Sequence, residues 1–390
     1  MKISIFNSAG TIDYLLGLVS GLSQVEEDSI DVLDADEEIN VFAPFTNVTF
    51  IPVFSIRLSK LSGFKKAWNT LRFYSLQFFY LLSRKPRIIH FQWLDRHKFI
   101  DRIIIPLIAK IRGHKTVLTV HNVNAGKRDN RNSWFNTFTL KCLYKQCNHL
   151  IVHTPDSKEE LKEEFQLPDA KISVIEHGMN IRVNQKGLTR EKARNVLDIG
   201  QDERVVLFFG NIDYYKGLDI LIESLNLLPS EFNENFRLII AGRIKSQEYK
   251  EVIDEIISRS RLKHRIIANM SYVHDNDVEA YFIASDCVAL PYRSIYQSGI
   301  IFMAYTFGLP VLASDVGNFR QDVPDGKSGF LLRENLPQAW NLMLQHYFSS
   351  ELYFNLSESR DKIKDWANSN YSWNEIGKKT RKVYESMLKH

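Results

Sequence analysis

The sequence is poor in cysteine and has no hydrophobic run long enough to span a membrane, and both absences exclude classes of protein. The three cysteines, Cys142, Cys147 and Cys287, lack the spacing of metal ligands and lie in apolar surroundings. They are typical of reduced thiols in a cytosolic protein. Charged residues interrupt the longest apolar runs well short of the roughly 20 residues that a membrane span needs. Because Met1–Asn7 predicts a strand and lacks a signal-peptide pattern, we expect a cytoplasmic protein.

The chain also lacks a strong charge imbalance, internal repeats and low-complexity tracts. Its net charge is only +4 and no recognised nucleic-acid-binding motif is present, so a nucleic-acid partner is not expected. At 390 residues the chain is too long for one ordinary core, and its length favours two domains of roughly 150–200 residues each.

Short apolar runs alternate with helical patterns throughout the N-terminal half. This alternation predicts a mostly parallel sheet with helices on both faces, and such sheets bind ligands beyond the carboxyl ends of their strands. The predicted strands are Ile3–Phe6, Asn40–Phe42, Val48–Val53, Ile88–Phe91, Thr116–Val120, Leu150–Val152 and Ile172–Ile175. The predicted helices are Ile12–Leu22, Phe64–Ser83, Phe99–Ile111, Ser133–Cys147 and Ser157–Phe165.

The polar stretch Asn180–Gln201 separates this half from a second series of alternating strands and helices. We predict an α/β fold with two doubly wound, Rossmann-like domains at residues 1–184 and 185–372. A last helix at 373–390 is expected to pack back toward the first domain. The strands of the second domain are expected at Val205–Phe209, Phe236–Ala241, Ile266–Asn269, Cys287–Leu290, Val311–Ala313 and Gly329–Leu331.

The stretch Leu290–Val311 has the pattern of an anion-binding turn. An apolar strand leads into a polar turn with Ser298 and Gly299, and an apolar helix begins at about Ile300. The first N–H groups of a helix lack intrahelical partners, and the helix dipole favours negative charge there. An ordinary strand-to-helix turn is the alternative.

Two further strand ends of the second domain carry residues that suit a phosphate. Gly210 ends one strand and Lys216 precedes the next helix, while Gly242 and Arg243 end the following strand. A lysine and an arginine at successive strand ends, beside a helix N-terminus, predict a diphosphate site.

His121 is the most informative polar residue of the first domain. It directly follows an apolar strand and precedes a loop rich in glycine and charge, where it would meet a phosphate or a substrate hydroxyl. The alternative is a loop histidine bonded to the backbone. For His90 and His177, which also close strands, a structural role is the preferred interpretation.

The segment Lys60–Arg87 combines aromatic and basic residues. Such a composition suits an amphipathic helix on an anionic membrane, which would make the protein peripheral on the inner face of the plasma membrane. A core helix with a solvated basic end is the other interpretation. The predicted apolar stripe of this helix is Ala67, Leu71, Tyr74, Phe78 and Leu81, with Trp68, Phe79 and Leu82 beside it.

These motifs together resemble those of the glycosyltransferases of family 4, which have the GT-B fold. The resemblance implies a hexosyltransferase that moves a hexose from a nucleoside-diphosphate sugar to an acceptor hydroxyl, with retention and usually without metal. The donor would bind the C-terminal domain and the acceptor the N-terminal domain. The matching stretches are Phe208–Asp219, Leu238–Gly242, Ala304–Gly317, Asp325–Leu332, His177–Gly178 and Thr119–Asn122.

The resemblance also implies roles for individual residues. Lys216 would hold the donor diphosphate, and His121 would lie near the transferred sugar or the attacking hydroxyl; these two are the catalytic candidates. The other donor-side candidates are Gly210, Asn211, Arg243, Gln297, Ser298, Gly299 and Ile300. The other acceptor-side candidates are Ser8, Gly10 and Asn122.

The sequence departs from the family pattern at three positions. Members commonly carry a pair of glutamates where this chain has Ile295 and Met303, and an arginine where it has Asn211. The diphosphate part of the site is therefore expected to be retained, while the ribose contact and one cation are missing or replaced. A branch with a Gln-Ser-Gly turn in place of the first glutamate is the most similar.

We expect a retaining glycosyltransferase of polysaccharide biosynthesis, and a lipid-linked saccharide acceptor would account for the basic aromatic helix. The departing nucleoside diphosphate needs amides and positive charge rather than a dedicated base, which favours front-face attack. A nucleotide-sugar epimerase with the GT-B fold is one alternative. A non-catalytic binding subunit is the other, because the paired glutamates are absent. No cofactor or metal is expected.

Overall fold

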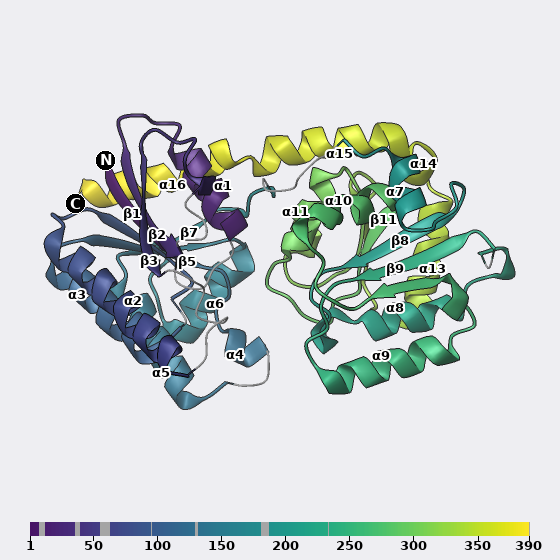
Figure 1. Cartoon of the computed structure of the whole chain (residues 1–390), viewed down its shortest axis with the longest axis horizontal. Helices are drawn as coiled ribbons and strands as arrows, with labels where there is room; N and C mark the ends of the chain where they lie inside the picture. The colour runs from purple at the N-terminus through teal and green to yellow at the C-terminus, as the bar shows by residue number, and fades with distance from the viewer. Residues whose placement is uncertain are drawn as a thin grey trace. The chain divides into compact units, whose positions relative to one another are not determined.

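The computed structural model describes residues 1–7, 12–35, 40–54, 63–94, 96–128, 132–180, 187–232 and 234–389. The chain divides into two compact units. Unit 1 comprises Met1–Ile181 and Tyr371–His390, and unit 2 comprises Arg182–Asn370. Each unit is built on one parallel sheet packed with helices (Figure 1). The predicted fold class, two doubly wound α/β domains, is confirmed.

The sheet of unit 1 has seven strands in the order β3-β2-β1-β4-β5-β6-β7. Every pair is parallel, and the order runs in opposite directions from β1, so a ligand crevice is expected beside β1 and β4. The strands are β1 (Lys2–Asn7), β2 (Ser29–Ala35), β3 (Val48–Phe54), β4 (Ile88–Gln92), β5 (Lys115–Val120), β6 (His149–Val152) and β7 (Ile172–Val174).

The strand predicted at Asn40–Phe42 is wrong, because the chain forms β2 at Ser29–Ala35 instead. Aspartates interrupt the apolar pattern of β2 and so concealed it. Asp31 is nevertheless buried, since Nη1 of Arg87 lies 2.5 Å from its Oδ2 and the hydroxyl of Tyr80 donates to the same oxygen. Paired charges of this kind are tolerated inside a sheet.

The last helix of the chain, α16 (Trp373–Leu388), packs against α1 (Ile12–Leu22) in unit 1. A Cβ atom on Gly17 or Gly21 would lie 2.0 Å from an atom of Trp373, so the two helices approach as closely as they do only because those positions are glycine. The other helices of unit 1 are α2 (Gly63–Ser83), the π-helical turn η3 (Ile100–Ile104), α3 (Ile105–Ile111), α4 (Ala125–Arg128), α5 (Trp134–Gln146) and α6 (Pro155–Phe165).

The sheet of unit 2 has six parallel strands in the order β10-β9-β8-β11-β12-β13. The order reverses at β8 and β11, which places the predicted anion turn after β11 at the switch point. The strands are β8 (Arg204–Phe209), β9 (Phe236–Ala241), β10 (Ile266–Asn269), β11 (Cys287–Leu290), β12 (Val311–Ser314) and β13 (Gly329–Leu332).

A buried ion pair fixes the start of β11. Nη2 of Arg194 lies 3.2 Å from Oδ2 of Asp286, and both side chains are fully buried. The same carboxylate accepts from the backbone N–H of Val205 at 2.8 Å, which ties β11 to β8. The helices of unit 2 are α7 (Arg190–Val196), α8 (Leu218–Leu225), α9 (Gln247–Arg259), α10 (Asp275–Ala284), α11 (Gly299–Thr306), α12 (Phe319–Asp322), α13 (Pro337–Phe348), α14 (Glu351–Phe354) and α15 (Leu356–Tyr371).

The cysteines are free thiols in this structure. Cys147 and Cys287 are buried, and burial raises the pKa of the Cys147 thiol to about 12. Within the described ranges, none of the helices is both long and apolar enough to cross a membrane.

Candidate functional site

Two glycines join the carboxyl ends of β8 and β9 in unit 2. Gly210 follows β8 with a φ of +102°, and Gly242 follows β9 with a φ of +144°. A Cβ atom on Gly242 would lie 2.0 Å from the carbonyl oxygen of Gly210. Both positions therefore require glycine. They bring two strand ends together at the edge where a ligand of this sheet would bind.

Lys216 lies beside this edge, as the last residue of a short 3₁₀ turn, η5 (Tyr214–Lys216). Only 6% of its surface is exposed. Its Nζ lies 3.4 Å from the position that a Cβ on Gly210 would occupy, and 4.9 Å from the ring centroid of Tyr292. The ammonium is therefore held beside Gly210, where an anion at the strand ends would meet it.

The first turn of α11 reaches the same place. The δ1-carbon of Ile300 lies 3.1 Å from the Cβ position of Gly210. Gly299 is exposed, and a Cβ on it would meet no described atom within 4 Å, so a ligand can approach its backbone closely. In the described part of the chain, Nε2 of Gln297 is buried without a hydrogen-bond partner. An anion that accepts hydrogen bonds suits this turn.

Ser298 leaves the amides of this turn uncapped. It is the N-cap residue of α11, yet its hydroxyl makes no capping bond to any described group. The hydroxyl is buried and lies 3.4 Å from that of Tyr292. Because a serine at this position usually caps the helix itself, the arrangement keeps donors available for a ligand.

Arg293 clamps the two loops of this site together, and sequence reasoning did not find it. Its Nη1 donates to the carbonyl of Tyr214 at 2.7 Å and to Asp219 at 2.9 Å. Its backbone N–H donates to Tyr215 at 2.7 Å, and its guanidinium lies 4.1 Å from the Tyr214 ring. Burial alone would raise the pKa of Asp219, but the hydrogen bonds from Arg293 and Tyr249 lower it.

The remaining donor-side candidates lie around this cluster. Asn211 and Arg243 are exposed, and their loops are joined by a 2.9 Å bond from the Ile212 N–H to the Arg243 carbonyl. Ile295 and Met303, at the positions of the absent glutamates, are half-buried. The carbonyl of Ile295 lies against Gly317, where a Cβ would come within 2.1 Å of it.

In unit 1, His121 follows β5 and lies between two aromatic rings. Its imidazole stacks on the indole of Trp93 with the centroids 4.2 Å apart and the planes at 4°. Tyr14 from α1 meets it edge to face at 4.6 Å. Trp93 holds a φ of +53°, which is uncommon for a large residue and marks local strain at this strand end. His121 therefore has a fixed ring plane.

A chain of hydrogen bonds passes through His121. Nδ1 of His153 lies 2.9 Å from the carbonyl oxygen of Ile175, and its Nε2 lies 3.2 Å from Nδ1 of His121. Nε2 of His121 lies 2.9 Å from Oε1 of Gln92. The amide of Gln92 contacts Nε2 of His90 at 3.0 Å. Beyond it, His90 bonds the hydroxyl of Tyr384 on α16 through Nδ1 at 2.5 Å.

The number of ring protons determines which groups donate and which accept along this series of hydrogen bonds. Nδ1–H of His153 donates to Ile175, so its Nε2 accepts and Nδ1 of His121 donates. In a neutral His121, Nε2 then accepts, and Gln92 can donate to it by turning over its amide, whose oxygen and nitrogen are nearly isosteric. With Oε1 of Gln92 facing it, His121 carries both protons. In either state, both of its nitrogens are occupied by protein groups.

Burial keeps this cluster neutral. It lowers the pKa of His90 and His153 to about 3 and that of His177 to about 4. Burial, and then the neighbouring histidines, lower the pKa of His121. The bonds of His90 suit the structural role expected for it, whereas His177 joins the cluster with its ring 5.5 Å from that of His153.

Two of these groups were missed from the sequence. His153 directly follows the predicted strand Leu150–Val152, so the rule that selected His121 could have selected it as well. Tyr14 lies inside an apolar helix and gave no polar signal. The acceptor-side candidates Ser8 and Gly10 lie outside the described residues.

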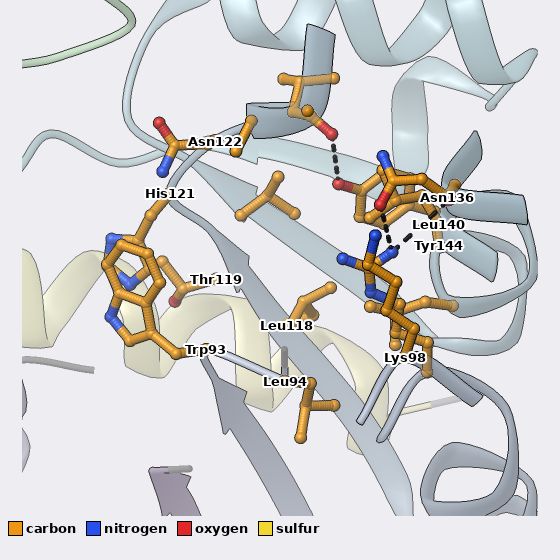
Figure 2. A pocket seen from close by; sticks show the side chains of 16 residues that line it. Trp93, Leu94, Lys98, Leu118, Thr119, His121, Asn122, Asn136, Leu140 and Tyr144 are labelled. Atoms are coloured by element: carbon orange, nitrogen blue, oxygen red, sulfur yellow. Dashed lines mark hydrogen bonds between the residues drawn. The ribbon is translucent and has the colours of Figure 1, made fainter. Parts of the chain in front are cut away.

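A pocket of about 290 Å³ opens beside His121, lined by residues of β5, η3, α4 and α5 and of the loop after β4. Figure 2 shows His121, Trp93 and Asn122 on one side of it and Lys98, Asn136 and Tyr144 on the other. Within the described residues, no group of three or more His, Cys, Asp or Glu side chains is arranged to hold a metal ion.

Two family models match the chain. The model of "Glycosyl transferases group 1" matches residues 189–369, and that of "Glycosyltransferase Family 4" matches residues 33–183. The first therefore falls within unit 2, and the second lies in unit 1 except for its last two residues. Between them they cover most of the chain.

Proteins of similar sequence are also named as glycosyltransferases. The chain is 26% identical over 251 residues to an uncharacterized glycosyltransferase of Methanocaldococcus jannaschii, covering 62% of this chain and 60% of that protein. It is 24% identical over 280 residues to the D-inositol 3-phosphate glycosyltransferase of Corynebacterium urealyticum, covering 70% of this chain and 64% of that protein. The chain thus spans less than two thirds of the length of either relative.

A solved structure shares the whole architecture. HepE of Anabaena in complex with UDP-glucose aligns with a TM-score of 0.74 over 99% of this chain and 100% of that one. The sequences are 16% identical, so this likeness concerns the fold.

Proposed function

Because this chain belongs to the family 4-like glycosyltransferases of GT-B fold, we propose that it transfers a hexose from a nucleoside-diphosphate sugar to a hydroxyl of a saccharide acceptor. One observation carries the proposal. Gly210, Lys216 and the uncapped first turn of α11 meet at one edge of the unit 2 sheet, as a diphosphate requires.

The proposed donor is a nucleotide sugar bound to unit 2. HepE, which shares the fold, was solved with UDP and with UDP-glucose, and this supports the choice of a nucleotide sugar. The diphosphate would lie across the Ser298–Ile300 turn with Lys216 beside it. The half-buried Ile295 and Met303 would offer the rest of the donor apolar contact in place of carboxylates.

The proposed reaction proceeds with retention by front-face attack. The acceptor oxygen bonds to the anomeric carbon on the face that the diphosphate leaves, and the bond from that carbon to the phosphate oxygen breaks. The acceptor proton passes to the departing phosphate oxygen. Lys216 and the α11 amides stabilise the charge that develops there. Transfer should be insensitive to EDTA, because this scheme uses no metal.

The geometry of His121 favours a positioning role in this reaction over that of a general base. Both of its nitrogens bond to protein groups, His153 and Gln92. The ring is also held between Trp93 and Tyr14. We therefore assign His121 to the surface that receives the sugar or the acceptor, while the proton follows the leaving group.

The proposed acceptor is lipid-linked, with the protein peripheral on an anionic membrane. On α2, Phe64, Trp68 and Phe79 are exposed by 84%, 60% and 71% of their surfaces. With Leu71 and Leu82 they fall on one face at 3.6 residues per turn. An amphipathic helix that turns its apolar face outward is expected to insert that face at a membrane interface.

The predicted stripe on α2 needs correction. Tyr74 and Leu81 are buried, whereas Ala67 and Leu71 are exposed. Apolar residues occur on both sides of α2, so periodicity alone could not tell which side faces inward. The hydroxyl of Tyr74 donates to Asp101 at 3.0 Å, which helps to fix the inward side.

The neighbouring helices extend this surface. α3 contacts both α2 and α5, and the three lie together in Figure 1. Exposed apolar residues continue on α3 and α5, and none of the three helices contains Asp or Glu. An apolar surface with basic charge only is complementary to an anionic bilayer. The added residues are Leu107, Ile111, Trp134, Phe135 and Phe138.

Two experiments test these proposals. Thermal stabilisation by UDP, GDP, ADP and their sugars should identify the nucleotide, followed by a transfer assay that resolves the anomer formed. Epimer formation without acceptor, or no nucleotide binding, would contradict the transferase proposal.

Co-sedimentation with phosphatidylglycerol and phosphatidylcholine vesicles tests the membrane proposal. The protein should prefer phosphatidylglycerol, and the double substitution Trp68→Ser/Phe79→Ser should abolish its binding to these vesicles. Equal partition to both lipids would contradict the membrane proposal.

A further inference from the structure

A second pocket lies in unit 2, between the loop that precedes β13 and the segment that forms α14 and α15. Its volume is about 410 Å³, which falls in the range of roughly 300–1,000 Å³ typical of small-molecule sites. The loop contributes Gly326, Lys327 and Ser328, and the α14–α15 segment contributes the other lining residues. The proposed transfer reaction gives this pocket no role.

This pocket lies at the opposite edge of the sheet from the proposed donor site. Ser328 directly precedes β13, at the amino ends of the parallel strands, whereas Gly210 follows the carboxyl end of β8. Helix α11 connects the two edges, because it begins at the donor turn and its Tyr305 hydroxyl lies 2.9 Å from that of Ser328. The eight residues of α11 span about 12 Å, so a ligand of this pocket is separated from the diphosphate turn.

The floor of the pocket is apolar. Leu352 and Ile363 are buried, with 8% and 1% of their surfaces exposed, and the half-buried Trp366 lines the pocket with them. Ile363 and Trp366 are three residues apart on α15, so they project from the same face of that helix. The indole of Trp366 also meets the ring of Tyr305 edge to face, with the centroids 5.4 Å apart. This floor offers carbon atoms on which the C–H groups of a ligand can pack.

The rim of the pocket carries both donors and acceptors of hydrogen bonds. Its uncharged polar residues include Asn355 and Ser359, which can do both. Glu358 and Lys362 form an ion pair in which Oε1 lies 2.7 Å from Nζ. The lining as a whole has no net charge, because its charged residues are two lysines and two glutamates: Lys327, Lys362, Glu351 and Glu358.

An apolar floor below such a rim favours a neutral ligand with hydroxyl groups. A charged ligand would meet as many like charges as opposite ones. A purely apolar ligand would cover the polar groups of the rim without satisfying their hydrogen bonds, which is unfavourable. A hydroxyl group both donates and accepts, so it can bond to an ammonium, a carboxylate or an amide. A sugar ring combines hydroxyl groups around its edge with C–H groups on its faces, and it therefore matches both parts of the pocket.

We propose that this pocket is a second saccharide site, which binds a neutral saccharide chain away from the reacting groups. The inference goes beyond the proposed transfer, because the pocket residues take no part in that reaction. A site of this kind keeps a long saccharide on the enzyme between successive transfers, and this raises the effective concentration of the acceptor.

The test is calorimetric titration of the full-length chain with maltotetraose, cellotetraose and laminaritetraose, three neutral saccharides that differ in linkage. Wild type should bind at least one of them. Trp366→Leu removes the ring from the floor and should abolish this binding. Lys327→Ala should weaken it roughly threefold or more, and it decides the test if Trp366→Leu fails to fold, because Lys327 is exposed. Lys192→Ala removes an exposed lysine from α7 and should leave binding unchanged.

The reacting site must be separated from this pocket, because it also receives a saccharide. A saccharide held only at the reacting site would bind equally to wild type and to Lys327→Ala, and that result overturns the proposal. Binding of none of the three saccharides by wild type overturns it as well. Lys216→Ala should keep the saccharide affinity of wild type, and Lys327→Ala should keep its UDP affinity. If Lys327→Ala weakens saccharide binding while no donor supports transfer, the proposed function fails and this inference stands.

Discussion

The two sheets present opposite kinds of edge to a ligand. In unit 1, His121 is fully engaged: its ring is stacked on Trp93 and its nitrogens bond to His153 and Gln92. In unit 2, the first turn of α11 is uncapped, and Gly299 has open space in front of it. The hydrogen-bonding groups of His121 are satisfied by other protein groups, whereas the first turn of α11 has hydrogen-bond donors available for a ligand.

This difference indicates that the two sheet edges have different functions in the proposed reaction. A rigid, neutral surface can position a sugar ring without exchanging protons, and the buried histidines of unit 1 are kept uncharged. A turn with available amides and a lysine stabilises charge only when a charged ligand arrives. The contrast predicts that charge changes in unit 2 reduce the rate, whereas changes of pH act mainly on the stability of unit 1.

The largest effect is expected from Lys216→Ala. Removing the ammonium beside Gly210 should lower turnover by roughly 10²–10³-fold, because it stabilises the departing diphosphate. Steady-state kinetics with the donor identified by screening measures it. Lys192→Ala, an exposed lysine on α7, is the control and should keep wild-type turnover. Near-normal turnover in Lys216→Ala would remove the assigned role.

Acidification should destabilise unit 1 selectively. The pKa values of His90 and His153 are lowered to about 3, so the unfolded state binds more protons than the folded state between that value and about 6.5. The contribution of each histidine to the free energy of unfolding is therefore complete above pH 6.5 and decreases as the pH falls below that value. At pH 5 the decrease is about 2 kcal/mol per histidine.

Hydrogen exchange at pH 7 and pH 5 can separate the two units. After correction for intrinsic exchange rates, amides of β4 and β6 should lose protection at pH 5, while those of β8 and β11 keep it. His90→Asn should flatten the pH dependence of unit 1. Equal loss in both units would contradict the contrast between them.

Arg293→Met is expected to lower kcat/KM about tenfold. The substitution breaks the side-chain bonds to Tyr214 and Asp219 and leaves the backbone bond to Tyr215, so the η5 turn that carries Lys216 is held less firmly against the loop that leads into α11. Arg293→Lys should restore part of the activity, since it keeps the charge but not the fork. A purely structural role would lower thermal stability without changing the donor KM.

The smallest effect is expected from Gly299→Ala. Its φ lies outside the left-handed region and a methyl group would meet no described atom within 4 Å, so the melting temperature should stay unchanged. The methyl group would instead occupy space in front of the turn and weaken nucleotide binding by a few-fold. Calorimetry with the preferred nucleotide measures this. Unchanged affinity would show that the ligand does not approach this amide.

Much of this architecture could be predicted from the sequence. Parallel strands buried on both faces give apolar runs, and the ends of those runs located Gly210, Lys216 and His121. β2 was missed because Asp31 breaks the apolar pattern, and its burial depends on Arg87, which is distant in sequence. Pairing between distant residues leaves no local signal.

The same limit applies to the supporting residues of the site. Arg293 acts through Asp219 and Tyr214, and an exposed arginine on a loop would have the same sequence context. His153 did carry a local signal, because it directly follows a strand. The face of α2 that turns outward could not be predicted, since apolar residues occur around most of that helix.

The position of α16 has a consequence for synthesis of the protein. Unit 1 needs this helix, because Tyr384 is buried and bonded to His90 and Trp373 packs against Gly17. All of unit 2 lies between the two segments of unit 1 in the chain. At the usual rate of translation, the ribosome needs on the order of 10–40 s to pass through it. The domain synthesised first is therefore the one completed last, and until then its α1 surface is a natural target for chaperones.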